Sequence, residues 1–206
     1  MSITPVGGWD GGYVTEVEEV GLGGVGFWPR VAARVIDLVA HYLVGSFTGI
    51  LFMVMLVVAS GGRVSPLVVG KLHHTGITGF AFALLGAFAY QVIFTTVHGS
   101  TLGKLVLGMV VVQEDGSPCR FKGALIRELG YFVDALFFGI IAYTAMQGTV
   151  QQQRHGDEWA HTVVCKRSLF TPDRLSSARQ FALALMFALM ADAALIMTGL
   201  LLVIAG

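Results

Sequence analysis

A stripe of polar residues runs along the first apolar segment of the chain. Most side chains between residues 31 and 58 are apolar, yet Arg30, Arg34, Asp37 and His41 follow one another at intervals of four, three and four residues. That spacing places all four on one face of an α-helix. Lipid tails offer charged groups no partner, so a helix that crosses a bilayer must turn such a face toward protein, water or headgroups. The stripe predicts a membrane protein with an organised polar interior or edge.

The composition supports the membrane class. Hydrophobic residues make up 55% of the chain and charged residues 13%, and the mean hydropathy is +0.74, which lies outside the usual balance of soluble domains. We expect a multi-pass protein of the cell (inner) membrane, with the lipid bilayer as a partner. The formal net charge is zero, so the overall charge gives no indication of nucleic-acid binding, and none is expected.

Neither the cysteines nor the N-terminus suggests a secreted or metal-bound protein. Cys119 and Cys165 are too few and too far apart for a disulfide scaffold or a zinc site, and we interpret them as reduced. The start of the chain lacks a basic region followed by an apolar stretch, so we expect no cleavable signal peptide. Residues 1–25, rich in glycine and acidic residues, predict a flexible N-terminal arm.

Four apolar segments follow, and three of them have the length of a membrane span. Residues 29–59, 76–97 and 181–205 each exceed the roughly 20 residues that a spanning helix needs. The third segment in chain order, residues 135–146, has only 12 uninterrupted residues, a length typical of re-entrant segments. The sequence therefore predicts an all-α membrane protein with three full spans and a re-entrant or bent third segment. A tilted full span over residues 131–150 is the alternative.

The positions of lysine and arginine favour the re-entrant alternative. If the third segment returns to the side that it left, 11 of the 13 basic residues lie on one side of the membrane, but a full span divides them almost evenly. Short cytoplasmic loops collect positive charge. We therefore expect a cytoplasmic N-terminus.

The segment after the second span predicts a small cytoplasmic β-hairpin or sheet. Ser100 and Thr101 are expected to cap a short amphipathic helix. The β-branched residues 110–112 and 162–164 are expected to pair as strands, and Asp115-Gly116 is typical of a turn.

The polar stripe has a functional and a structural interpretation. Asp37 and His41 could bind or relay a proton or cation, or Arg34, Asp37 and His41 could satisfy one another at the end of the helix. The 21 residues from 38 to 58 already cover about 31 Å at about 1.5 Å each, so Asp37 is expected near the membrane edge and the structural interpretation is favoured.

Ion pairs between helices are expected to hold the polar residues together. Arg127 precedes Asp134 by seven residues, as Arg30 precedes Asp37, and two turns are too long for easy contact within one helix. We expect Arg127 or Arg154 to pair with Asp37, and Arg30 or Arg34 to pair with Asp134.

Other motifs are weaker. Gly45 and Gly49 form a G-x-x-x-G pair that predicts close helix packing. His73 and His74 lack a third metal ligand at suitable spacing, so we expect no metal. The chain contains no G-x-S-x-G, H-E-x-x-H or phosphate-binding loop, so we expect neither an enzyme nor a cofactor.

Three blocks in this order resemble the RDD family of membrane proteins. They read G-F-W-P-R-V-A-A-R-V-I-D at residues 26–37, G-S-T-L-G-K-L-V-L-G-M-V-V-V-Q-E-D-G at 99–116 and R-H-G-D-E-W-A-H-T-V-V at 154–164. The resemblance covers residues 26–167 and implies a compact α-helical membrane domain. In that family, transport of unidentified ligands has been suggested, and some members have been proposed as cation/proton antiporters.

The resemblance assigns the residues only in part. Arg30 and Asp37 match the family's first block, and its second aspartate corresponds to Asp134 or Asp157. Glu158, Trp159 and His161 depart from the family's pattern, which puts in doubt any role that needs a positive charge there. Residues 168–206, a linker and an additional span, lie outside the resemblance.

Two functions follow as hypotheses. Three or four segments make a thin wall for a solute path, which favours a small accessory subunit that packs against another membrane protein or associates with itself through Gly45 and Gly49. The alternative is a transporter-like protein in which Asp37, His41, Asp134 and Asp192 handle a proton or cation. Asp192 lies in the middle of the fourth segment, where an aspartate costs about 2.5–3.5 kcal/mol and needs protonation, water or a partner such as Gln91, His41 or Tyr90.

Overall fold

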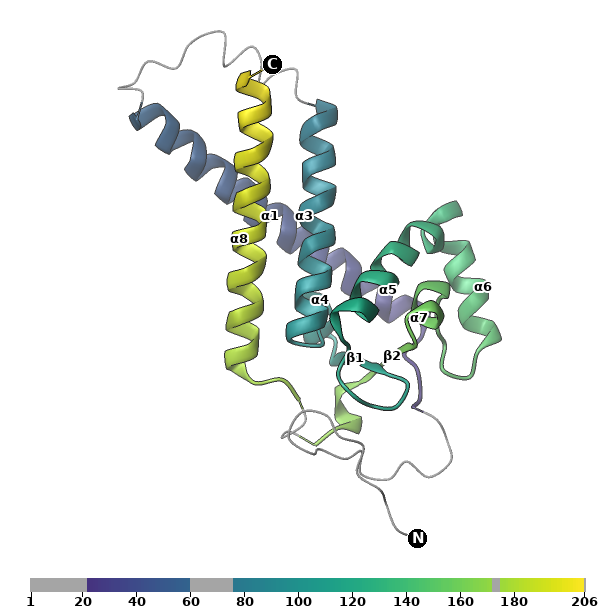
Figure 1. The fold of residues 1–206 in the computed structure, drawn as a ribbon. Coiled ribbons are helices and arrows are strands. Elements are labelled where there is room, and N and C mark those ends of the chain that lie inside the picture. The colour runs from purple at the N-terminus through teal and green to yellow at the C-terminus, as the bar shows by residue number, and fades with distance from the viewer. Residues whose placement is uncertain (1–21, 60–75, 172–174, 206) are drawn as a thin grey trace. The chain divides into compact units, whose positions relative to one another are not determined.

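The computed structural model describes residues 22–59, 76–171 and 175–205 of the chain (Figure 1). Helices dominate these ranges, and two strands form one small sheet. The elements in chain order are α1 (Phe27–Ala59), α3 (Gly76–Val97), α4 (Leu102–Val106), β1 (Met109–Gln113), α5 (Phe121–Asp134), η2 (Leu136–Gly139), α6 (Ile140–Gly148), α7 (His155–Trp159), β2 (Thr162–Lys166), η3 (Arg167–Leu169) and α8 (Ala178–Ala205).

The chain divides into two compact units. Unit 1 comprises Met1–Asp37 and Gln91–Leu185, and unit 2 comprises Leu38–Tyr90 and Met186–Gly206. Each of the three long helices α1, α3 and α8 passes from one unit into the other. Unit 1 therefore contains one end of every long helix, together with everything between α3 and α8.

Three helices in the described ranges are long and apolar enough to cross a membrane. The qualifying stretches are Phe27–Ile50 in α1, Gly79–Val97 in α3 and Ala178–Gly199 in α8. They confirm the first, second and fourth predicted segments, and the protein is a multi-pass membrane protein. The hydrophobic driving force here is transfer into lipid, because most large apolar side chains on these helices are exposed.

The third segment is bent, as one of the two alternatives predicted. Helix α5 has 14 residues and ends at Asp134, and α6 has only 9 residues. Between them the backbone turns through η2, where Phe137 and Gly139 have φ angles of 51° and 84°. Neither helix reaches the roughly 20 residues of a span, so the tilted full span over residues 131–150 was wrong.

The chain from α3 to α8 returns to the place that it left. The Ser176 hydroxyl, just before α8, donates a hydrogen bond to the His98 carbonyl, just after α3. The Phe181 ring lies 5.6 Å from the Phe94 ring and 5.4 Å from the His98 ring, both edge-on. Because α3 ends where α8 begins, the segment between them makes no net crossing. The fold has three full spans and one bent third segment.

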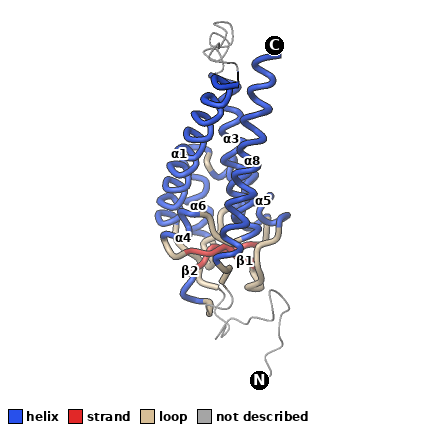
Figure 2. Tube along the Cα trace, turned by 90° about the vertical axis from the view of Figure 1, so that its left-hand side faces the viewer, coloured by secondary structure: helices blue, strands red, loops and turns tan. Residues whose placement is uncertain are grey.

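A two-stranded antiparallel sheet joins the two flanks of that segment. Strands β1 and β2 pair with Val110 opposite Cys165 and Val111 opposite Val164 (Figure 2). The pairing of the two β-branched stretches was predicted correctly. The strands are separated by α5, η2, α6 and α7, so the element is a sheet between distant segments and not a hairpin.

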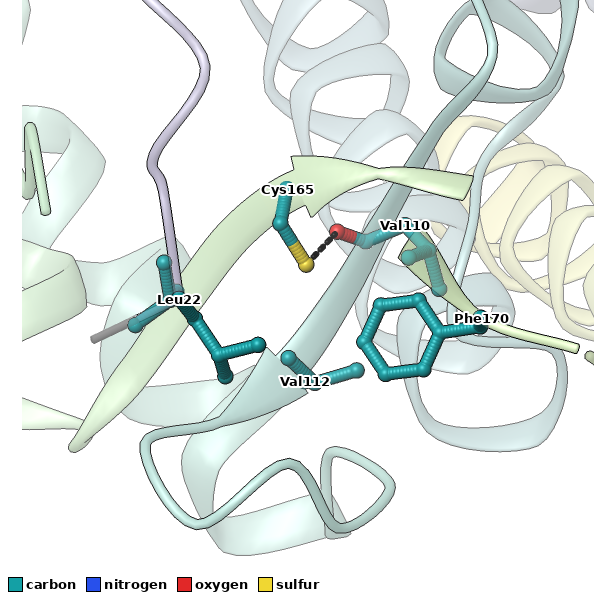
Figure 3. Close-up of a cluster of buried hydrophobic side chains, with 6 residues drawn as sticks. Leu22, Val110, Val112, Cys165 and Phe170 are labelled. Carbon is teal, nitrogen blue, oxygen red and sulfur yellow. Dashed lines mark hydrogen bonds between the residues drawn. The ribbon is translucent and has the colours of Figure 1, made fainter. Parts of the chain in front are cut away.

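The sheet carries a small apolar core. Leu22, Val110, Val112, Cys165 and Phe170 gather on one side of it (Figure 3), together with Val163. The Val25 amide donates to the Val164 carbonyl over 2.8 Å, so the chain before α1 runs along β2.

The predicted N-terminal arm is described only in part. It was expected to extend through residue 25, but residues 22–25 contribute Leu22 and Val25 to buried positions on the sheet. Residues 1–21 lie outside the described residues, as do His73 and His74.

The predicted turn and amphipathic helix are both present. Gly116 has a φ of 77°, and its amide donates to the Gln113 carbonyl over 2.9 Å. Helix α4 exposes Val106 and, at its end, Leu107, as an amphipathic helix at a membrane surface should.

Two glycines let α5 and α7 approach closely. A Cβ atom built on Gly130 of α5 would lie 2.4 Å from the Gly156 Cα of α7, and one built on Gly156 would lie 2.7 Å from the Arg127 carbonyl oxygen. Real Cβ atoms do not approach backbone atoms so closely. The contact between the two helices therefore requires glycine at both positions.

We expect the Gly130→Ala substitution to lower the free energy of unfolding by about 1–3 kcal/mol, because the added methyl group must push α7 away from α5. Thermal unfolding of the purified protein in detergent measures this change. Gly148→Ala in α6 is the matched control, since a Cβ there meets nothing within 4 Å. An equal loss of stability in both variants would contradict the role of the close approach.

Candidate functional site

Asp157, in the first turn of α7, binds three arginine side chains. Its side chain is completely buried. Arg30, in the first turn of α1, donates a hydrogen bond to its Oδ2 atom, and Arg127 of α5 lies 3.1 Å from Oδ1 through Nη2. Arg154, at the N-cap of α7, reaches Oδ1 over 3.4 Å. One carboxylate therefore ties together α1, α5 and α7.

The three guanidinium groups keep Asp157 ionised. Burial alone would raise the pKa of this carboxyl group, but the positive charges of Arg127, Arg154 and Arg30 outweigh burial and hold its pKa well below the usual range. Burial also acts against the charge of Arg154, yet Asp157 and Asp134 raise the pKa of that guanidinium. The ion pairs are stable at any physiological pH, and Asp157 exchanges no proton there.

Asp134 closes a second junction between α5 and α7. It is the last residue of α5, and its Oδ2 atom accepts a 3.3 Å hydrogen bond from the Gly156 amide. Arg154 Nε lies 3.9 Å from the same oxygen, and His155 Nδ1 lies 3.4 Å from Oδ1. Asp134 and Asp157 therefore each contact both backbone and cationic groups.

A third ion pair links α1 to α5. Arg34 Nη2 lies 2.6 Å from Glu128 Oε1, and the Arg34 guanidinium stacks 4.1 Å above the centre of the Tyr131 ring. Glu128 was not among the predicted site residues. Its position beside Arg127, on the face that also carries Tyr131 and Asp134, was the available signal.

The predicted partners of the arginines were wrong. Arg30 binds Asp157 and not Asp134, and Arg34 binds Glu128. Arg127 binds Asp157, and Arg154 binds Asp157 and Asp134. The predicted residues do come together in unit 1, but in a different pairing, because a helical face fixes direction and not the height at which two helices meet.

Asp37 binds the N-terminal end of α4. The side chain is 2% exposed, and its Oδ1 atom accepts a 2.7 Å hydrogen bond from the Gly103 amide. Its Oδ2 atom accepts bonds from the Thr101 hydroxyl over 2.6 Å and from Gln91 Nε2 over 3.0 Å. An anion beside the free amides of a helix start is stabilising.

This geometry changes one sequence prediction. Thr101 is the N-cap of α4, but its side chain makes no capping bond there and donates to Asp37 instead. Gly103 permits the contact, since a Cβ on it would lie 2.0 Å from the Ala33 carbonyl oxygen. Gln91 and Thr101 carried no sequence signal for this role.

Lys104 completes the Asp37 network. Its Nζ atom lies 3.2 Å from Gln91 Oε1 and 3.4 Å from the Thr101 hydroxyl. Burial, followed by repulsion from Arg127, lowers the pKa of Lys104 to about 7, although Asp37 and Glu128 act in the opposite direction. This amine therefore loses its proton at a lower pH in the folded protein than in the unfolded chain.

Unit 2 contains a separate polar cluster inside the spans. A Cβ built on Gly86 of α3 would lie 2.8 Å from Asp192 Oδ1 of α8 and 3.0 Å from His41 Cε1 of α1. Tyr90, one turn after Gly86, has its ring 6.4 Å from the His41 ring. Asp192 Oδ2 is buried and has no hydrogen-bond partner among the described residues. Side chains from α1 and α8 therefore meet α3 at Gly86, where the absence of a side chain permits their close approach.

The predicted packing surface at Gly45 and Gly49 is open within the described residues. A Cβ on either glycine meets nothing within 4 Å. Together they line an apolar groove of about 630 Å³ in unit 2, with Ser46, Ile50, Val54, Val57 and Val58. Close packing at these glycines stays a prediction.

A metal site finds no support in the described ranges. No group of three or more His, Cys, Asp or Glu side chains among those residues could hold a metal ion. Burial raises the pKa of both thiols, to about 12 for Cys165, so neither cysteine is a good nucleophile or ligand.

The comparisons with known proteins give one match. A family model described as the RDD family matches residues 25–161. No curated protein and no solved structure matches the chain.

We expect Asp157→Asn to destabilise the protein by about 3–5 kcal/mol, because it leaves three buried guanidinium groups without their anion. Thermal unfolding in detergent at pH 7 measures this. The Asp157 carboxylate contributes fully to the free energy of unfolding above its pKa of about 3.9 in the unfolded chain. This contribution declines as pH falls toward the lower pKa of the folded protein, so the stabilities of wild type and Asp157→Asn should converge in acid. Glu158→Gln, one residue later in α7, should change little. Equal effects of both substitutions would argue against the ion-pair role.

The lowered pKa of Lys104 predicts a pH-dependent stability. Between a pH of about 7 and the ordinary lysine pKa of 10.5, the folded protein binds fewer protons at this site than the unfolded chain, so stability should rise with pH over that window. Lys104→Met should remove this rise while leaving other titrations intact. Melting temperatures of both proteins from pH 6.5 to 9 test the difference. Parallel curves would contradict the assignment.

Proposed function

The chain belongs to the RDD family, and from that premise we propose that it is a membrane transport protein that exchanges a proton or a cation at Asp192 and His41. This is the second of the two functions considered from the sequence. The geometry of unit 2 favours it over an accessory subunit.

The observation that carries the proposal is the environment of Asp192. Its carboxylate lies in a helix of 28 residues with membrane-spanning composition. One of its oxygens is buried without a hydrogen-bond partner among the described residues. An unsatisfied carboxylate in this setting is costly unless it takes up a proton or a cation. The site therefore favours a reversible change of charge.

His41 supplies the second exchangeable group. Its imidazole and the Asp192 carboxylate both lie next to the position that a Cβ atom on Gly86 would take. An imidazole and a carboxylate in proximity can share one proton, and a bound cation can displace that proton. Glycine at position 86 allows both side chains to approach α3 this closely.

The ion pairs of unit 1 support a different role for the remaining charged residues. Asp157 forms ion pairs with three arginines, and Asp37 accepts hydrogen bonds from Gln91, Thr101 and Gly103. Groups that are so fully bonded hold the fold and exchange little. We therefore assign Arg30, Arg34, Asp37, Arg127, Asp134, Arg154 and Asp157 to positioning the helices.

The accessory-subunit function remains the second candidate. The open groove around Gly45 and Gly49 has the small residues that allow two transmembrane helices to approach closely. A helix of another membrane protein is the occupant that this candidate requires. For both candidates we propose a location in the cell membrane with a cytoplasmic N-terminus, on the basis of the distribution of Lys and Arg.

Ion exchange can be measured with the purified protein in liposomes that carry a pH gradient and a trapped pH-sensitive dye. We expect wild-type protein to dissipate the gradient when sodium or potassium is added. Asp192→Asn and His41→Gln should reduce the rate to that of protein-free liposomes, because neither amide can take up the proton. Gly86→Ala should also impair exchange, since its methyl group would lie 2.8 Å from Asp192 Oδ1 and 3.0 Å from His41 Cε1 and must displace these side chains.

Thr198→Ala in α8 is the matched control. The Thr198 hydroxyl bonds only to the Ala194 carbonyl of its own helix, so exchange should persist. Melting temperatures show whether each variant is folded. Unchanged exchange in folded Asp192→Asn would refute the proposal. Absent exchange in wild type, with Ser46→Cys cross-linking to another membrane protein in cells, would favour the accessory subunit.

A further inference from the structure

Helix α5 buries charged side chains and exposes apolar ones, which is the reverse of the arrangement on a helix of a soluble protein. It buries Arg127, Glu128 and Asp134, and it exposes Phe132 and Leu129 by more than half of their surface. In water, the opposite arrangement is the stable one. Charged residues turned inward and apolar residues turned outward are what a lipid environment selects.

The same exposed character continues through the turn into α6. Leu136, Phe137 and Ile140 are exposed by more than half of their surface, and Tyr143 by 43%. Such a run of large apolar side chains on one supersecondary element exceeds what scattered surface residues explain. The surface needs an apolar occupant.

The contacts of unit 1 indicate which occupant fits. Unit 1 contains one end of each of the three candidate spans, so it lies where the bilayer begins. Phe27, at the start of α1, packs edge-on against Tyr143 at 5.5 Å and lies beside the turn at Gly139. The hairpin is therefore anchored to a helix that enters the membrane.

Both helices are too short to cross the bilayer, and α6 matches the thickness of one leaflet while α5 requires a tilt. At about 1.5 Å per residue, α5 and α6 are about 21 and 14 Å long, and half of the hydrocarbon core is about 15 Å thick. Exposed Arg120 and Lys122 stand at the start of α5, where headgroup phosphates would meet them. Trp159 in α7 is exposed as well, and tryptophan favours the interface.

We propose that α5, η2 and α6 insert as a re-entrant hairpin into the hydrocarbon of one leaflet, with Phe137 at its deepest point. The acyl chains of that leaflet cover the exposed apolar face. The buried ion pairs Arg34–Glu128 and Arg127–Asp157 then hold the inward face against α1 and α7 without exposing charge to lipid. The proposal does not depend on the ion-exchange function.

Single-cysteine labelling of the full chain in liposomes tests the insertion. The native thiols of Cys119 and Cys165 are buried, so unsubstituted protein measures background labelling. A polarity-sensitive fluorophore is placed at Leu129→Cys, Phe132→Cys, Phe137→Cys, Ile140→Cys and Gln147→Cys. Asp115→Cys, in the exposed turn after β1, is the control on the aqueous side.

Quenching is measured with nitroxide groups at two depths in the acyl chain and with iodide in water. We expect quenching by the deeper nitroxide to increase from residue 129 to residue 137 and to decrease again by residue 147. Iodide should quench the probe at residue 115 and spare the probe at residue 137. An impermeant thiol reagent should reach Asp115→Cys and Gln151→Cys from the same side.

Three results would overturn the proposal. Iodide quenching at residue 137 would place the hairpin in water. Labelling of residues 115 and 151 from opposite sides would establish a full span. A probe at residue 137 that neither iodide nor lipid nitroxides quench would indicate that protein, and not lipid, covers the hairpin.

Discussion

Burial of charge inside a membrane-embedded domain is the constraint on which the structure depends. A guanidinium or carboxylate taken from water without a partner costs several kcal/mol, and unit 1 buries both kinds of group. The Asp157 carboxylate offsets this cost for Arg30, Arg127 and Arg154 at once. Because these residues belong to α1, α5 and the start of α7, the ion pairs form only when the three helices come together. The glycines at positions 130 and 156 bring α5 and α7 close enough for these pairs.

The two aspartates of the first and third sequence blocks act on different partners. Asp157 binds arginine side chains, whereas Asp37 binds the backbone of α4 together with Thr101 and Gln91. In unit 2, by contrast, Asp192 Oδ2 has no hydrogen-bond partner among the described residues. These two carboxylates of unit 1 are therefore bonded more fully than that of Asp192.

Sequence patterns predicted the elements better than the contacts between them. The apolar lengths identified the three spans, and the β-branched stretches at residues 110–112 and 162–164 identified the strand pair. The partners of Arg30 and Arg34 were wrong, because periodicity reports which way a side chain points but not the level at which helices cross. Glu128 was missed for the same reason, and Gln91 and Thr101 were predicted in other roles than binding Asp37. Their bonds to Asp37 depend on the close backbone approach at Gly103, which no local pattern encodes.

The bond between Arg30 and Asp157 joins residues separated by 127 positions, and this separation affects how the protein is made. At about 5–20 residues per second, the ribosome delivers Asp157 about 6–25 s after Arg30. During that interval the first helix has emerged while its arginine lacks its final anion. Until Asp157 has been synthesised, we expect Arg30 to stay hydrated, in the translocation channel or at the headgroups. Because α7 is synthesised late, the third block of the sequence supplies the anion that the first helix needs.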